Sequence, residues 1–378
     1  MRPGAQVNMA DVARHAGVST ATVSRALRDL PGVSEETRVR VKAIATKLSY
    51  VVSPEASRLS GGATGRVAVV VPRVNTWYFS TMLAGLEAVF REAELDMLLY
   101  HVGGAADRQR FFERLPTRRK ADAVVIVALP VPEEQMDRLD LMGVEVVVAG
   151  GRIADYACVR VDDRAAAEQA VHHLLTLGHT RVAMMRTEDR EGIVWPIDRA
   201  RWLGYRDALE AGGLEYDERY VVTVPFTNDG GAEGMAQLLS MRQPPTAVFA
   251  HSDEMALAAM RTLRRAHVAV PASMSLVGVD DHPMAELLEL TTVRQPVEEQ
   301  GRRTAMMVLD LLAGRSVQER DVVLPTYLVV RGSTGPSADG APRRPAGRQA
   351  DNQAGKQAGK QAGKQVRRAG SSSPARGA

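Results

Sequence analysis

Through the first fifty residues, apolar positions recur at the i, i+3, i+4, i+7 spacing of short amphipathic helices. The pattern predicts a first helix over residues 9–16, capped by Asn8 and ended by Gly17, which adopts the left-handed conformation at little cost. A second helix is predicted from Thr20 to about Arg28, behind the N-cap residue Ser19.

A third helix is predicted to begin after Ser34, with acidic residues in its first turn, where they favour the helix dipole. Its inward face is expected to carry Val39, Ile44 and Leu48, with Val41 and Ala45 as further candidates. Three short helices around so small a core are typical of a DNA-binding headpiece, with the first two forming a helix-turn-helix.

Residues 53–62 resemble a helix of barely two turns, with Ser53 as N-cap, Pro54 at the first helical position and Gly61-Gly62 as the stop. A helix this short is not stable alone in water. We therefore expect it to form only when something packs against it.

From Val67 the pattern changes to apolar strands that alternate with amphipathic helices. Continuous valine-rich strands separated by helices indicate parallel sheets covered on both faces. Nine strands are more than a single sheet usually holds, and the series of strands divides near Val159. The predicted fold class is therefore α/β with two Rossmann-like lobes. The predicted strands are 67–71, 97–100, 123–128, 146–149, 159–161, 181–185, 221–224, 247–250 and 275–279. The predicted helices between them include 80–93, 164–177, 200–211, 230–240 and 254–267.

Composition excludes several classes of protein. The 378 residues contain no apolar run of 18 or more, so we expect no membrane span. The first residues do not resemble a secretory signal, which indicates a cytoplasmic protein. The single cysteine, Cys158, excludes a disulfide framework and is expected to be a buried structural thiol.

Charge is distributed unevenly along the chain. Residues 1–66 carry a net charge of +5 and residues 333–378 one of +7, which leaves residues 67–332 at −9. Basic ends suggest contact with a polyanion. The last segment repeats Gln-Ala-Gly-Lys and is expected to be disordered. The predicted parts are therefore a headpiece (1–52), a hinge helix (53–62), a two-lobed domain (63–332) and a basic tail (333–378).

The segments Met9–Leu27 and Gly32–Arg38 closely resemble the headpiece of the lac repressor (LacI/GalR) family of transcription regulators. The resemblance continues through the hinge and to about Arg331. It implies that the second helix enters the major groove of operator DNA. Carried over residue by residue, it assigns base contacts to Thr20, Ala21 and Arg25, and backbone contacts to Ser19, Thr22, Ser34, Thr37 and Tyr50. Arg25 is the strongest candidate, because its fork fits guanine O6 and N7.

By the same resemblance, hinge helices from two subunits enter the minor groove, and Leu59 acts as a wedge in a central base step. The alternative is that Leu59 simply packs in a linker. The tail lacks the leucine-rich helix of family tetramers, so we expect a homodimer. The tail itself could add nonspecific affinity for DNA.

The two-lobed domain resembles the periplasmic sugar-binding fold, with a small effector between the lobes at the carboxyl ends of the strands. The residues in register with the family's pocket are Tyr78, Phe79, Arg201, Phe226, Ser252, Asp280 and Gln295. Arg201 and Asp280 are the charged pair expected to bind a polyol, the alternative being a structural salt bridge between the lobes. Asp162 and Asp253 are either further ligands or helix caps.

Three positions depart from the family pattern. Gly150 stands where many sugar-binding members carry Asp, Ser252 replaces a common Asn, and Trp77 replaces a frequent Pro. These changes remove polar anchors and add an aromatic surface. A sugar is the expected effector, and a nucleoside or another aromatic-compatible metabolite is the alternative.

The sequence shows no apparatus for catalysis. No helical His-x-x-x-His pair and no Gly-x-Ser-x-Gly elbow is present, and we expect neither a metal nor a cofactor. A transport receptor with the same two-lobed fold and a Rossmann enzyme are the rival classes. The first would need an export signal, and the second a glycine-rich loop in place of residues 72–76. A repressor controlled by an effector is the expected function.

Overall fold

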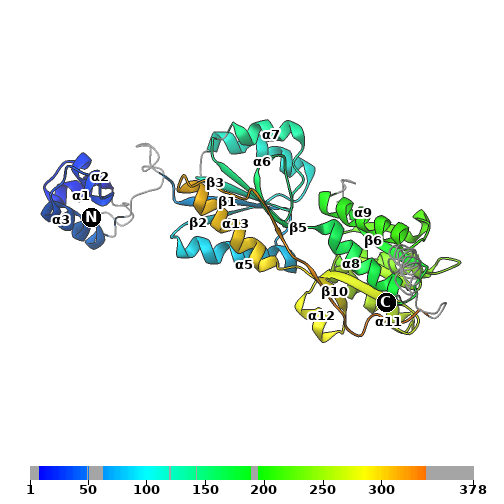
Figure 1. Ribbon diagram of the computed structural model, residues 1–378. Helices are drawn as coiled ribbons and strands as arrows, with labels where there is room; N and C mark the ends of the chain where they lie inside the picture. The colour runs from blue at the N-terminus through cyan, green and yellow to red at the C-terminus, as the bar shows by residue number, and fades with distance from the viewer. Residues whose placement is uncertain are drawn as a thin grey trace, which may run out of the picture. The chain divides into compact units, whose positions relative to one another are not determined.

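The computed structural model describes residues 8–48, 50, 63–118, 121–141, 143–188 and 195–337 (Figure 1). The chain forms two compact units. The first unit comprises Met1–Val161 and Pro296–Leu324, and the second comprises Asp162–Gln295 and the chain from Pro325 onward. The predicted hinge helix and its Leu59 lie outside the described residues.

The headpiece, residues 8–50, consists of α1 (Met9–Ala16), α2 (Thr20–Leu27) and α3 (Glu35–Lys47). Asn8 and Asp11 form a reciprocal cap at the start of α1, each side chain accepting a hydrogen bond of 3.1 Å from the other's backbone N–H. Gly17 ends α1 with φ of 66°, as predicted. The apolar faces of the helices meet in one small core, whose fully buried members are Val12, Ala13, Ala16, Val23, Ala26, Val41 and Ala45.

One prediction about this core is wrong. Val39 is 59% exposed, whereas Val41 and Ala45 are buried and Ile44 and Leu48 are partly buried against the same core. Residues two positions apart on a helix point about 200° apart, so Val39 cannot share the face of Val41.

The first unit contains a parallel sheet in the order β11-β5-β4-β3-β1-β2, flanked by helices. Its strands are β1 (Arg66–Val71), β2 (Asp96–His101), β3 (Ala123–Val127), β4 (Glu145–Ala149), β5 (Ala157–Val161) and β11 (Asp321–Leu324). Its helices are α5 (Trp77–Glu92), α6 (Ala105–Arg118), α7 (Glu133–Asp140) and α13 (Val297–Leu312). The central strands are buried along their length, as a sheet covered on both faces requires.

The second unit contains a sheet in the order β12-β10-β9-β8-β6-β7, parallel except for the pair β10–β12. Its strands are β6 (Val182–Glu188), β7 (Val221–Pro225), β8 (Ala247–Ala250), β9 (Ser275–Asp280), β10 (Thr291–Arg294) and β12 (Tyr327–Val329). Its helices are α8 (Asp163–Thr176), α9 (Pro196–Ala211), the 3-10 turn η1 (Glu218–Tyr220), α10 (Asn228–Leu239), α11 (Asp253–Arg265) and α12 (Pro283–Leu287). Two apolar clusters pack in this unit, and strand residues contribute to both.

All nine predicted strands are present, and the two-lobed α/β architecture is confirmed. Three strands escaped prediction, namely β10, β11 and β12. They are short, and β11 and β12 are half exposed, so they lack the continuous apolar run that marks a central strand.

The chain passes between the units three times, after Val161, Gln295 and Leu324. The predicted division near Val159 marks only the first of these passages. After the third, residues 333–337, which the sequence places in the tail, are hydrogen-bonded to the second unit: Ser333 Oγ donates to Leu276 O, and Ser337 N donates to Leu177 O.

Among the described residues, no helix is both long and apolar enough to cross a membrane. The same residues contain no group of three or more His, Cys, Asp or Glu side chains that could hold a metal ion. Cys158 is buried in β5, as predicted, and burial raises the pKa of its thiol to about 11.

Candidate functional site

The predicted base-reading side chains lie on the surface of α2. Thr20, Ala21 and Arg25 are all exposed, while Val23 and Ala26 of the same helix are buried in the headpiece core. The sequence expectation of an exposed second helix is therefore met. A side chain with this placement can reach a partner without disturbing the core.

The predicted backbone-binding hydroxyls occur as two matched pairs at helix starts. Ser19 Oγ accepts from Thr22 N at 3.1 Å and lies 2.9 Å from Thr22 Oγ1. Ser34 Oγ likewise accepts from Thr37 N at 3.3 Å and donates to Thr37 Oγ1 at 2.9 Å. Each pair caps a helix and fixes its hydroxyls at the end where the helix dipole attracts anions.

Tyr50, the remaining predicted backbone contact, packs on the headpiece core and is half-buried. Burial raises the pKa of its hydroxyl, against the opposing charge of Arg28. The hydroxyl therefore keeps its proton at neutral pH and can donate to an acceptor such as a phosphate oxygen.

The cations of the headpiece fall into two groups. Arg38 and Lys42 bind the carboxylate of Asp29, at 3.1 and 2.7 Å. Arg25 forms no ion pair or hydrogen bond through its side chain with any residue that the structure describes. A cation that is exposed and unneutralised retains its full charge for an external anion or acceptor.

A second candidate site occupies the carboxyl edge of the sheet in the second unit. Arg201 donates through Nη1 to His251 O, directly before Ser252, and the Phe226 ring lies edge-to-face against His251 with centroids 5.7 Å apart. Asp280 Oδ1 accepts from Gln295 Nε2 at 2.6 Å. Five of the seven predicted effector residues thus belong to this edge cluster: Arg201, Phe226, Ser252, Asp280 and Gln295.

The charged partner of Arg201 is Asp163. Arg201 Nε and Nη2 lie 2.9 and 2.8 Å from Asp163 Oδ1, and Arg201 itself is only 4% exposed. Arg201 and Asp280 both belong to the second unit, so the alternative of a salt bridge between the lobes is wrong for this pair. Burial raises the pKa of Asp163, and the Arg201 charge opposes that rise.

A buried ion network lies behind this pair. Asp198, which is fully buried, accepts from Arg186 Nε at 2.9 Å and from Thr187 N at 3.0 Å, and its Oδ1 lies 3.4 Å from His251 Nδ1. Burial alone would raise the pKa of Asp198, but His251, Thr187 and Arg186 together lower it. Burial lowers the pKa of His251, so the network at neutral pH holds an ionised Asp198 and a neutral imidazole.

Asp280 lies beside a second buried carboxyl, that of Asp253. Burial and the Asp253 charge raise the pKa of Asp280, while Arg201 opposes the rise. Asp253 is held by Thr292 Oγ1 at 2.7 Å and by His282 N at 2.9 Å, and burial raises its pKa as well. Two buried acids so close together resist double ionisation.

Asp162 and Asp253, for which the sequence left open a role as ligand or as helix cap, differ in the structure. Asp162 caps α8, with Oδ1 accepting from Ala165 N at 3.0 Å. Asp253 is not a cap, because Ser252 occupies that position at the start of α11 and accepts from Met255 N.

The remaining two predicted effector residues, Tyr78 and Phe79, begin α5 in the first unit. Phe79 is buried, Tyr78 is half-buried, and their rings pack edge-to-face with centroids 5.1 Å apart. A Cβ on Gly150 would lie 2.1 Å from Tyr78 Oη. Tyr78 thus fills the space that a larger side chain at position 150 would need, and the backbone φ of 67° at Gly150 favours glycine independently.

Sequence reasoning missed Asp163, Arg186, Asp198 and His251. Three of them follow or end parallel strands: Asp163 comes after β5, Arg186 lies near the end of β6, and His251 follows β8. β6 and β8 belong to one sheet and their carboxyl ends share one edge, so the positions of Arg186 and His251 were a usable signal. Asp163 follows a strand of the other sheet, so its position gave no such signal. Asp198 lies inside α9, and its position in the sequence gave no such signal either.

Two family models match the chain. Residues 8–53 match the model described as bacterial regulatory proteins, lacI family, and residues 171–334 match a periplasmic binding protein-like domain. The first match covers the headpiece with its exposed α2, and the second covers most of the unit that holds the edge cluster.

Relatives align over most of the chain. The HTH-type transcriptional repressor CytR of Escherichia coli (strain K12) is 31% identical over 330 residues, which is 86% of this chain and 96% of that protein. The solved complex of the transcriptional regulator CelR with cellobiose is 31% identical, covers 87% of this chain and all of that one, and has a TM-score of 0.65. A LacI-family regulator from Enterococcus faecium with bound ribose is 27% identical, covers 72% and 99%, and has a TM-score of 0.64.

These relatives are named as transcriptional regulators, and the matches to this chain cover both its helical headpiece and its two-lobed α/β part. The chain is a DNA-binding transcriptional regulator that belongs to the lacI family of bacterial regulatory proteins.

Proposed function

We propose that α2 reads operator DNA from the major groove through Thr20, Ala21 and Arg25. The observation that carries this proposal is Arg25, whose guanidinium is exposed and makes no ion pair or hydrogen bond with the described residues. It can offer a bidentate fork to guanine, while Thr20 adds a hydroxyl and Ala21 an apolar contact to a thymine methyl.

The capped hydroxyl pairs place the headpiece on the DNA backbone. Ser19 with Thr22, and Ser34 with Thr37, present hydroxyls at two helix starts, and Tyr50 adds a protonated phenol. Contacts of this kind fix register and orientation without reading sequence.

The effector is a small polyol bound at the edge cluster. Arg201 and Asp280 offer a donor fork and an acceptor for vicinal hydroxyls, Gln295 and Ser252 add neutral hydrogen bonds, and Phe226 offers a ring for an apolar sugar face. Tyr78 and Phe79 are proposed as further aromatic contacts. Relatives crystallised with cellobiose and with ribose support a sugar.

Effector binding changes operator affinity through a shift between two states of a homodimer, and the protein acts as a repressor without catalysis. A coupling of about 1–3 kcal/mol would change operator occupancy several-fold to about a hundredfold. Leu59 serves as the minor-groove wedge that engages only in the DNA-competent state.

Two measurements test this function. Operator sequences selected from random DNA should bind with an affinity that falls steeply with salt concentration. A panel of sugars and nucleosides should then contain one compound that raises the melting temperature and alters operator affinity. Failure to retain any DNA sequence over nonspecific DNA would refute the regulator function. A ligand that raises the melting temperature without any effect on DNA binding would refute the proposal that effector binding controls operator affinity.

A further inference from the structure

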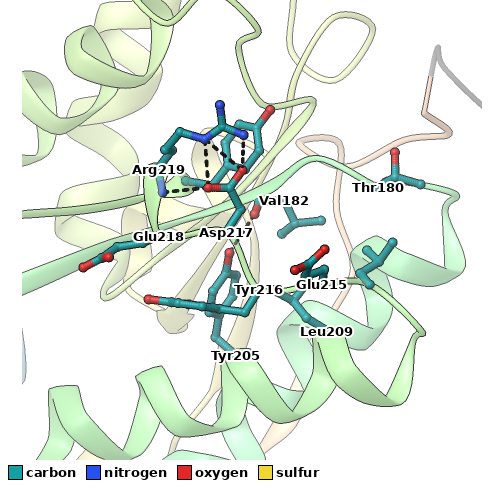
Figure 2. Close-up of a pocket in the computed structure, with 11 residues that line it drawn as sticks. Thr180, Val182, Tyr205, Leu209, Glu215, Tyr216, Asp217, Glu218 and Arg219 are labelled. Atoms are coloured by element: carbon teal, nitrogen blue, oxygen red, sulfur yellow. Dashed lines mark hydrogen bonds and ion pairs between the residues drawn. The ribbon is translucent and has the colours of Figure 1, made fainter.

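A hollow of the second unit lies away from the edge cluster, beside the start of the sheet rather than its carboxyl edge. It has a volume of about 460 Å³ and is lined by residues of α9, by the segment before β7 and by Thr180 and Val182 near the start of β6 (Figure 2). Tyr205 forms part of its wall and is fixed there, because its hydroxyl donates to Val182 O at 2.8 Å.

The hollow is rich in carboxylates. Glu215, Asp217 and Glu218 line it together with a single cation, Arg219, among its described lining residues. Arg219 is paired with Asp217, its Nη2 lying 2.7 Å from Oδ2. Glu215 and Glu218 are exposed and form no ion pair with any residue that the structure describes. Two carboxylates of the hollow therefore stay available to an external cation.

The aromatic side chains next to these acids already accept a guanidinium. The Arg206 guanidinium carbon lies 4.8 Å from the centroid of the Trp202 ring and 5.1 Å from that of Tyr216, which itself lines the hollow. Arg186 lies 5.1 Å over the same Trp202 ring, so these aromatic faces already carry cations of the unit itself. The exposed carboxylates are therefore the groups that remain open to a further Arg or Lys side chain.

The described chain ends close to this hollow. Ser337 N donates to Leu177 O at 2.9 Å. The ring of His179, the residue directly before the lining residue Thr180, lies 3.0 Å from Gly335 O. Residues 338–378 follow, with nine Lys or Arg and two Asp. A chain reaches about 3.5 Å per residue, so Arg343 and Arg344 can extend about 20 Å from Ser337.

We propose that this hollow binds the protein's own basic tail, with Arg343 and Arg344 as the first side chains to dock. The tail supplies the guanidinium groups that the carboxylates lack, and its attachment at Ser337 provides a high local concentration that a free peptide would not have. Docking also holds these cations away from DNA.

The test uses the full-length chain with a fluorophore on Ala346→Cys. Cys158 is buried and its thiol has a raised pKa, so the new cysteine is labelled selectively. A dye quenched on contact with tryptophan reports docking through Trp202, and fluorescence lifetimes give the ratio of quenched to unquenched molecules. We expect a clear quenched population in the labelled protein at low salt.

The double variant Glu215→Gln, Glu218→Gln should lower that ratio about 2- to 30-fold, the range spanned by two exposed ion pairs. The control variant Glu233→Gln, Glu286→Gln removes two exposed carboxylates elsewhere in the second unit and should leave the ratio unchanged. Trp202→Phe should remove the quenching itself.

Three results would overturn the proposal: equal ratios in the double variant and its control, quenching that persists in Trp202→Phe, or quenching that disappears on dilution because the tail reaches a second molecule. None of these readouts involves DNA, so their failure leaves the operator-binding function standing.

Discussion

Helix α2 of the headpiece, which we propose reads DNA, and the edge cluster of the second unit use arginine in opposite ways. Arg25 is exposed and makes no ion pair or hydrogen bond with the described residues, whereas Arg201 is 4% exposed and bound to both Asp163 and His251. A side chain that takes no part in the fold can be changed without loss of stability. A side chain that neutralises a buried acid holds the fold and the proposed ligand together, so its role in binding cannot be altered alone.

The largest effect that tests this contrast is expected from Arg201→Ala. It leaves the carboxyl of Asp163, whose side chain is only 11% exposed, without its cation, which should destabilise the protein by about 3–5 kcal/mol as well as abolish effector binding. Urea denaturation measures the change. Arg199→Ala, an exposed arginine on the same helix, should stay within about 0.5 kcal/mol of the parent. Equal stability of the two variants would contradict the structural role assigned to Arg201.

Asp280→Asn should separate the two roles within the edge cluster. It keeps an acceptor oxygen for Gln295 but replaces the other carboxyl oxygen by an amide N–H, which would leave an effector hydroxyl unpaired. At a cost of about 1–3 kcal/mol, effector affinity should fall about 5- to 150-fold by calorimetry. At neutral pH the same variant should melt at a higher temperature, because burial and Asp253 make ionisation of Asp280 unfavourable in the native state.

The pH dependence of this gain follows from the raised pKa of Asp280. As pH falls through the folded-state pKa, the native protein takes up a proton that the unfolded chain binds only near its lower, ordinary pKa, so the parent gains stability. The advantage of Asp280→Asn over the parent should therefore shrink as pH decreases. An advantage that grows toward acid pH would contradict the assignment.

Arg25→Ala should alter function alone. Loss of a bidentate base contact costs about 1–3 kcal/mol, or about 5- to 150-fold in operator affinity, with relaxed preference at one base pair. Fluorescence anisotropy gives the affinity, and the melting temperature should not change. Arg40→Ala removes an equal charge from the exposed side of α3 and should weaken specific binding less. If Arg40→Ala weakened specific binding more than Arg25→Ala, Arg25 would contribute only its charge and would not contact a base.

The smallest effect is expected from Asn8→Ala, which removes a cap and should cost about 1 kcal/mol. Asn8 is not among the proposed DNA contacts, so its loss should lower the stability of the headpiece and leave the bound complex at saturating protein unchanged. Hydrogen exchange of α1 amides measures the first quantity. A change in base preference would show that this cap also positions α2.

Much of the fold followed from the sequence because its signals are local. Val67–Val71 and Ala123–Val127 are apolar runs that predict buried parallel strands, and Ser19 and Ser34 are caps that the structure retains. The prediction that Val39 faces the core was wrong, because an apolar residue on a short basic helix can also lie on its exposed side. The edge strand β11 pairs with β5 across more than 150 residues, and no local pattern records such a pairing.

The candidate site was predictable only in part. Arg201 and Asp280 were found through the family resemblance. The ionic partner of Arg201 is Asp163, which follows a strand of the other sheet, and no local pattern joins the two residues. Asp198 is polar and sits within a helix, where a sequence pattern would make it a surface residue, yet three groups from β6 and the β8–α11 junction surround it. Burial of an acid is decided by its tertiary neighbours.

The final strands β11 and β12 have a consequence for synthesis on the ribosome. Each sheet receives an edge strand from residues 321–329, whereas the headpiece is complete before residue 51. Domains form in order as the nascent chain emerges. The headpiece helices are therefore synthesised some 270 codons before either sheet has all its strands. A message that stops short of Asp321 would encode a chain able to form the headpiece but neither complete lobe.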